Sequence, residues 1–84
     1  VNTGAIIEHD CLVGDGLHVC PRACLCGHVT VGQAAWIGAG ALVRDRATIG
    51  TNAFIGIGAL VLGDVAGEML AFGHPARSIR KLQA

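Results

Sequence analysis

The chain has 84 residues, of which 52% are hydrophobic and 14% charged, and its six basic and six acidic residues cancel to a formal net charge of zero. This length accommodates one small domain, and the neutral charge argues against a nucleic-acid ligand, which requires clustered Lys and Arg. The apolar content excludes intrinsic disorder, and Gly or charged residues interrupt every apolar run before the roughly 18 residues of a membrane span.

From its first residue the sequence repeats every six positions. Each sixth residue is aliphatic in eleven positions out of eleven: Val1, Ile7, Val13, Val19, Leu25, Val31, Ile37, Val43, Ile49, Ile55 and Val61. The residue two positions earlier is usually Ala. Side chains two apart on a strand point to the same side. Each hexad therefore predicts a short strand with two inward side chains, followed by a corner.

Three such strands use eighteen residues and close one triangular coil, and successive coils stack at about 4.8 Å. We predict an all-β fold, a parallel β-helix of between three and four coils over residues 1–66. A short C-terminal tail over residues 67–84 follows and contains a G-H-P-A-R turn at 73–77. Small inward residues explain why only Trp36, Phe54 and Phe72 are aromatic, since a narrow core holds no large rings.

Outward side chains recur every eighteen residues on one face of the prism. The first face carries His18, Trp36 and Phe54, the second Ile6, Cys24, Leu42 and Leu60, and the third Leu12, Thr30, Thr48 and Ala66. The first two faces are apolar outside as well as inside, which solvated monomers rarely tolerate. We predict a homotrimer in which the first face of each chain packs on the second face of its neighbour; coverage of these faces by the tail is the alternative.

The hexads, of pattern [LIV]-G-x-x-A-x, and the segment at 73–77 together resemble the hexapeptide-repeat acyltransferases. More narrowly, N-T-G-A at 2–5, I-E-H-D at 7–10 and G-D-G-L-H at 14–18 resemble the NeuD/PglD-like sugar acetyltransferases. The resemblance implies a left-handed β-helix, a trimer, and acetyl-CoA as the acetyl donor. Family members also carry an N-terminal subdomain that binds a nucleotide sugar, and these 84 residues contain no counterpart of it.

The resemblance assigns His9 as the general base and Asp10 as the residue that raises its basicity, because a nearby carboxylate favours the imidazolium. A positioned base of this kind accelerates a reaction by about 10²–10⁴-fold. On the donor side it assigns His18 to a contact near the thioester and Gly27 to a backbone N–H that approaches the thioester oxygen.

Ala39 and Ile57 match family positions that contact the CoA arm through the main chain. Each assignment has a structural alternative. His9 is then a solvated corner residue with incidental acids beside it, His18 an interface residue stacked on Trp36, and Gly27 a corner glycine kept for its φ angle.

Two zinc interpretations are weaker than the acyltransferase one. His18, Cys20, Cys24, Cys26 and His28 lie within eleven residues, but extended strands spread them over more than about 10 Å, too far for ligands of one ion. The histidines also lack the five-residue spacing of the metal site in β-helical carbonic anhydrases. We therefore expect no metal cofactor, and free cysteines in a reducing cytoplasm, since no secretory signal is present.

We expect an acetyl-CoA-dependent acetyltransferase that acts on an amino or hydroxyl group of a sugar, of the nucleotide-linked amino sugar or sialic acid type. Transfer is direct, with His9 as the base and active sites between subunits. The alternative is a non-catalytic trimeric β-helix that serves as a scaffold or assembly module. The pair His9–Asp10, together with His18, favours the enzyme, because a scaffold has no need of polar groups at apolar interfaces.

Overall fold

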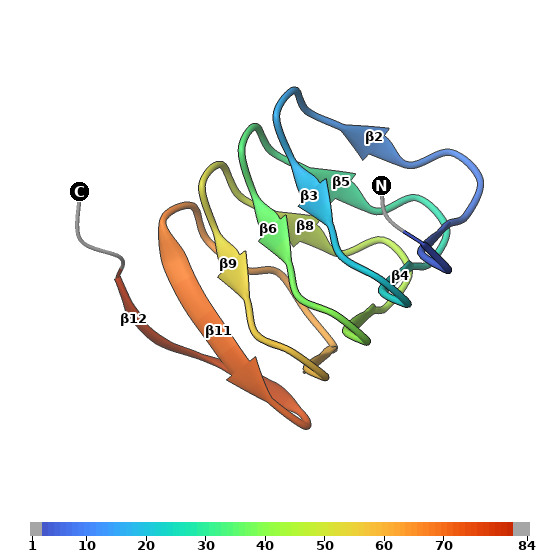
Figure 1. The fold of residues 1–84 in the computed structure, drawn as a ribbon. Coiled ribbons are helices and arrows are strands. Elements are labelled where there is room, and N and C mark those ends of the chain that lie inside the picture. Colours follow the sequence, from blue (N-terminus) through green and yellow to red (C-terminus); the bar gives the residue numbers. More distant parts are fainter. Residues whose placement is uncertain (1–2, 82–84) are drawn as a thin grey trace.

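The computed structural model describes residues 3–81, which form a three-sided left-handed β-helix of about four turns (Figure 1). Ten two-residue strands follow one another at six-residue intervals: β1 (Ile6–Ile7), β2 (Leu12–Val13), β3 (His18–Val19), β4 (Cys24–Leu25), β5 (Thr30–Val31), β6 (Trp36–Ile37), β7 (Leu42–Val43), β8 (Thr48–Ile49), β9 (Phe54–Ile55) and β10 (Leu60–Val61). Two longer strands end the chain, β11 (Met69–Gly73) and β12 (Ala76–Lys81). The predicted fold class is confirmed, and within residues 3–81 no helix could cross a membrane.

Strands of successive coils stack in parallel to form three sheets. Their orders are β1-β4-β7-β10 on the second face, β2-β5-β8 on the third, and β3-β6-β9-β11-β12 on the first. His18, Trp36 and Phe54 are direct neighbours in the first-face ladder, as the eighteen-residue step predicts. The hexad fixes this register because a slip of one residue would turn every inward side chain outward.

Inward side chains form a narrow apolar column along the axis of the prism. Leu25, Ile37, Ile49 and Ile55 are fully buried, and alanines pack between the aliphatic layers. The first coil is the exception, because its inward Val13 is 45% exposed. The solenoid therefore shows part of its core at the end formed by β1, β2 and β3.

Each corner contains one residue with left-handed backbone. Asp10, His28 and Arg46 occupy equivalent positions in three stacked coils, with φ between 60° and 67°. The N–H of His28 donates to the carbonyl of His9 at 3.1 Å, and that of Arg46 to Gly27 at 3.0 Å, so one hydrogen bond per coil joins the stacked turns. We name this corner, residues 8–10, 26–28 and 44–46, the histidine corner; it lies between the second and third faces. The Ala39 corner, residues 20–22, 38–40 and 56–58, lies between the first and second faces.

The repeat loses two residues after β10. The step between neighbouring coils falls from eighteen residues to sixteen there, so Val65 bridges Ile49. The prediction that Ala66 lies over Thr48 is therefore wrong. Asp64 lies there instead, and its Oδ1 accepts a hydrogen bond of 2.8 Å from the backbone N–H of Thr48.

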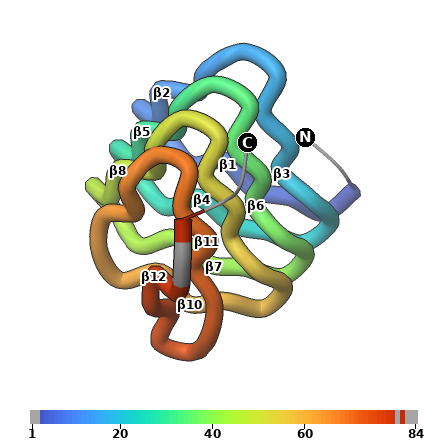
Figure 2. Tube along the Cα trace, turned by 90° about the vertical axis from the view of Figure 1, so that its left-hand side faces the viewer, coloured from blue at the N-terminus to red at the C-terminus, as the bar shows by residue number. Residues whose placement is uncertain are grey.

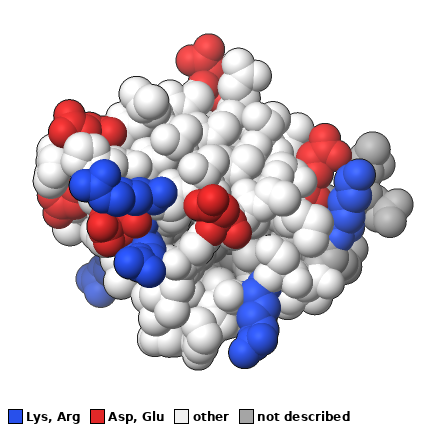
Figure 3. Space-filling view, turned by 180° about the vertical axis from the view of Figure 1, so that it is seen from behind, with Lys and Arg blue, Asp and Glu red and all other residues white. Residues whose placement is uncertain are grey.

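The segment predicted as a tail is largely ordered as a hairpin. β11 continues the first face by pairing in parallel with β9, and β12 returns antiparallel to it (Figures 1 and 2). The hairpin leaves Trp36 39% exposed, Phe54 38% and Leu42 38%. The first and second faces thus remain open, which contradicts the alternative that the tail covers them. On the side shown in Figure 3, charged side chains are scattered among uncharged ones without a broad patch of one sign.

Candidate active site

His9 lies at the histidine corner with its imidazole against the backbone of the next coil. A Cβ built on Gly27 would lie 3.2 Å from both Cε1 and Nε2 of His9, closer than ordinary contact. The φ angle of Gly27 lies outside the left-handed region. The absence of a side chain at Gly27 therefore gives room to the His9 ring, and a left-handed φ does not explain this glycine.

The backbone N–H of Gly27 is available to a ligand beside His9. Among residues 3–81 it donates no hydrogen bond, whereas its carbonyl accepts one from Arg46. An N–H held in this way by a rigid coil can stabilise negative charge that develops on an oxygen. The histidine corner thus holds an exposed imidazole and a backbone N–H without a hydrogen-bond partner among residues 3–81.

Asp10 and His28 complete the exposed part of this corner. Nε2 of His28 lies 3.9 Å from Oδ2 of Asp10, and the rings of His9 and His28 meet edge-on with centroids 5.3 Å apart. One ligating atom from each of the three residues lies within 4.8 Å of the other two. The structure therefore places His9 and Asp10 at one corner and adds His28, which pairs with Asp10 and which sequence reasoning missed as a neighbour of His9.

His18 lies on the first face at the start of an aromatic stack. Its ring centroid is 4.8 Å from that of Trp36, and Trp36 stacks in parallel on Phe54 at 5.9 Å. The alternative assignment of His18, as a residue stacked on Trp36, describes this contact. His18 is nevertheless exposed, so its imidazole is open to a ligand that lies along this face.

Ala39 and Ile57 lie one coil apart on the Ala39 corner. Their backbone N–H groups donate no hydrogen bond within the described part of the chain, while the carbonyl of Ala39 accepts one from Gly58 at 2.8 Å. The side chain of Ile57 is 76% exposed. These positions fit main-chain contacts to a ligand that runs parallel to the prism axis.

Within one chain these residues form two separate groups. His9 and Gly27 belong to the histidine corner, whereas His18, Ala39 and Ile57 belong to the first face and the Ala39 corner. The second face, formed by β1, β4, β7 and β10, lies between the two groups. The two groups therefore do not adjoin one another within one chain.

Cys11, Cys20, Cys24 and Cys26 are free thiols in the described part of the chain. Burial raises the pKa of the Cys24 thiol, and the nearby Cys26 raises it further. A thiol held protonated in this way is a poor nucleophile, so direct transfer is chemically simpler than a route through an acetylated cysteine. Cys11 instead donates through Sγ to the carbonyl of Cys26 at 3.1 Å.

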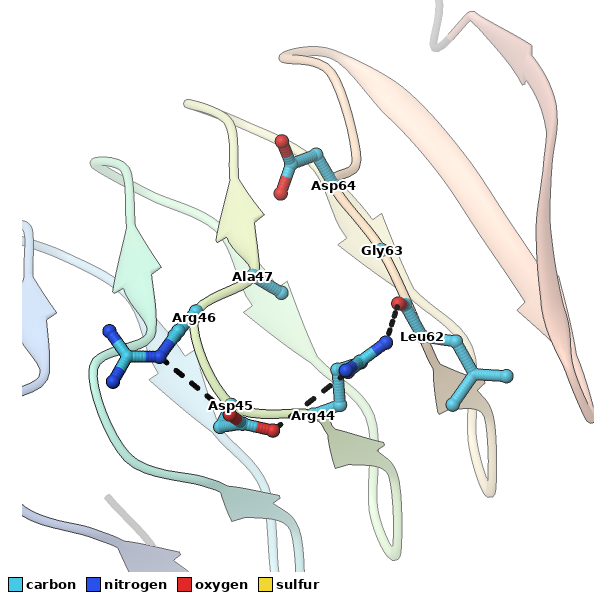
Figure 4. Close-up of a pocket in the computed structure, with 7 residues that line it drawn as sticks. All are labelled: Arg44, Asp45, Arg46, Ala47, Leu62, Gly63 and Asp64. Carbon is cyan, nitrogen blue, oxygen red and sulfur yellow. Dashed lines mark hydrogen bonds and ion pairs between the residues drawn. The ribbon is translucent and has the colours of Figure 1, made fainter.

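A pocket of about 230 Å³ lies between the third coil and the segment after β10 (Figure 4). Its lining consists of Arg44, Asp45, Arg46, Ala47, Leu62, Gly63 and Asp64. Asp45 lies between the two guanidinium groups, 3.8 Å and 3.9 Å from their Nε atoms. Two arginines and two aspartates balance in charge, so the pocket has no bias toward an anion.

No family model matches the chain, and a search of curated protein sequences finds no match. Solved structures do match it. The acetyltransferase domain of PglB from Neisseria gonorrhoeae, in complex with acetyl coenzyme A, is 37% identical with a TM-score of 0.92, over 94% of this chain and 38% of that one. A galactoside acetyltransferase in complex with coenzyme A is 27% identical with a TM-score of 0.86, over 94% and 50%.

The serine acetyltransferase of Neisseria gonorrhoeae, in complex with serine, is also 27% identical, with a TM-score of 0.78 over 88% of this chain and 36% of that one. The chain thus spans half the length of these proteins or less. Its structural neighbours are hexapeptide-repeat acetyltransferases, which confirms the resemblance seen in the sequence.

Proposed function

We propose that this chain is the acetyl-transfer domain of an acetyl-CoA-dependent acetyltransferase that modifies an amino or hydroxyl group of a sugar. The observation that carries the proposal is the position of His9, packed against the side-chain-free Gly27 and beside Asp10, on a β-helix 37% identical to a domain solved with acetyl coenzyme A. A sugar acceptor of the nucleotide-linked amino sugar or sialic acid type is supported by the sequence resemblance. The match to a galactoside acetyltransferase supports a sugar in general.

In the proposed reaction the acceptor nitrogen or oxygen attacks the carbonyl carbon of the thioester while His9 takes the proton from the attacking atom. The Gly27 N–H donates to the carbonyl oxygen as negative charge develops on it. The C–S bond then breaks, and the CoA sulfur leaves and takes up the proton that His9 accepted, so that acetylated acceptor, CoA and neutral His9 are the products. Asp10 is the carboxylate beside His9 in this scheme. No step requires a covalent enzyme intermediate.

A homotrimer would unite the two groups of site residues. The first and second faces expose Trp36, Phe54, Leu42 and Ile6 between 38% and 50%, and burial of such apolar area drives association. If the first face of one chain packs on the second face of the next, His18 of the former lies against a surface that the histidine corner of the latter borders. CoA would then lie in the groove between two chains. The free thiols support a reducing compartment such as the cytoplasm for this assembly.

The first test is a calorimetric titration of acetyl-CoA into the intact protein, with the oligomeric state measured by light scattering. We expect saturable binding near one site per chain that weakens in His18→Ala. Thr30→Ala, in β5 on the third face and outside both groups, is the control and should bind as the wild type does. An intact trimer that binds no acetyl-CoA would contradict the proposal and favour the non-catalytic scaffold.

A further inference from the structure

The histidine corner gathers two imidazoles and a carboxylate at an exposed edge of the first two coils. One ligating atom from each of His9, Asp10 and His28 lies within 4.8 Å of the others, and all three residues are exposed. Imidazole nitrogen and carboxylate oxygen are the ligands that Zn²⁺ takes in sites where a water completes the coordination. The eighteen-residue period places His28 one coil from Asp10, and the structure shows that His9 approaches the same point.

The distances are close to those that one ion requires. Two imidazoles bound at about 2.0–2.1 Å to a tetrahedral zinc have ring centroids about 5 Å apart, and those of His9 and His28 are 5.3 Å apart. A nitrogen and an oxygen on the same ion lie about 3.4 Å from each other, against 3.9 Å between His28 and Asp10. The three ligating atoms lie within 4.8 Å of one another, so binding of one ion requires the exposed side chains to turn toward each other.

The backbone holds the three residues in place at the surface of the corner. Asp10 and His28 occupy the same left-handed position in successive coils, and the hydrogen bond from the N–H of His28 to the carbonyl of His9 fixes one coil over the other. Gly27 leaves the space in which the His9 ring approaches His28. Within residues 3–81, no side-chain hydrogen bond involves these three groups.

We propose that His9, Asp10 and His28 bind one divalent transition-metal ion of the zinc class per chain. The ion is not a cofactor of acetyl transfer. On the proposed function, it occupies the nitrogen lone pair with which His9 acts as a base, so that zinc inhibits the reaction reversibly. The metal site itself stands independently of that function, because it depends only on the three side chains.

Zinc chloride titrated by calorimetry into the intact protein, stripped with EDTA and dialysed, tests the site. We expect one ion per chain. His28→Gln and Asp10→Asn should each weaken zinc affinity by more than about tenfold, because the loss of an outer-shell partner alone already weakens metal binding by about that factor. His74→Gln changes a histidine outside the corner and is the matched control. Circular dichroism verifies that each variant is folded. Equal zinc affinity in His28→Gln and the wild type would overturn the proposal.

A titration with Co²⁺ in place of Zn²⁺ distinguishes binding at this site from binding at the cysteines. Nitrogen and oxygen ligands give tetrahedral Co²⁺ absorption without a thiolate-to-cobalt charge-transfer band. A thiolate band that persists in His28→Gln would place the ion on the cysteines and refute the site. In the transfer assay, zinc inhibition reversed by EDTA supports competition for His9. Zinc binding without any transfer after EDTA treatment would leave the metal site standing and contradict the proposed function.

Discussion

Replacement of Gly27 by alanine tests whether the position of His9 matters for the reaction. The added Cβ would lie 3.2 Å from Cε1 and Nε2 of His9, where ordinary contact begins at 3.4 Å. The imidazole must then move by a few tenths of an ångström, while the backbone remains unstrained because the φ of Gly27 is not left-handed. The substitution therefore displaces the base and leaves the backbone N–H in place.

A misplacement of about 1 Å in a catalytic group can cost about 10²-fold in rate, so we expect kcat to fall by about three- to tenfold in Gly27→Ala. The free energy of unfolding should change by less than about 0.5 kcal/mol, as at other sites without a backbone clash. Gly63→Ala is the matched control, because a Cβ at Gly63 meets nothing within 4 Å. The measurements are CoA release with a thiol reagent and thermal unfolding. A Gly27→Ala rate equal to that of Gly63→Ala would refute the role given to this contact.

Three further substitutions have distinct expected outcomes. His9→Ala should lower transfer by at least about 10²-fold while acetyl-CoA affinity measured by calorimetry stays within a few-fold, and a variant that retains most of its rate would remove His9 as the base. Leu42→Glu places a charge on the apolar second face and should abolish the trimer and the activity together, as light scattering and the transfer assay would show; an active monomer contradicts the shared site. Gly38→Ala brings a Cβ to 2.7 Å from backbone atoms of the next coil and should lower the free energy of unfolding by about 1–3 kcal/mol, whereas an unchanged melting temperature would mean that the coils are less tightly stacked than described.

The register of the coils could be predicted from the sequence because one physical requirement repeats. A narrow column accepts an aliphatic and a small side chain from every strand, so the hexad fixes which residues point inward and which stack eighteen residues apart. His18, Trp36 and Phe54 lie in one ladder for that reason. The left-handed corner residues were less predictable, since Arg22 and Ala34 adopt φ near 60° beside the more tolerant Asp and Gly.

The predicted register is wrong after β10, where the six-residue repeat ends. Strict continuation would place Gly67 at the inward aliphatic position of the last coil on the third face. Because the coil is two residues shorter, Val65 occupies that position instead, and its exposed fraction is only 5%. Burial of a valine side chain in place of a glycine is favourable by roughly 1.5–3 kcal/mol. Asp64 then accepts the hydrogen bond of the Thr48 N–H, which offsets part of the cost of the irregular turn.

In the candidate site, the stacking of coils could be predicted from the sequence, whereas the orientation of the side chains could not. Asp10 and His28 are eighteen residues apart, so the period already places them one above the other, as it does His18 and Trp36. The edge-on approach of His28 to His9 depends on ring orientation and on the space above Gly27, neither of which the period specifies. On the two proposals above, the imidazole of His9 therefore serves both as a base and as a metal ligand. Because both use a nitrogen lone pair of the same ring, zinc and acetyl transfer should compete, and His28→Gln should relieve zinc inhibition without the loss of the base that His9→Ala entails.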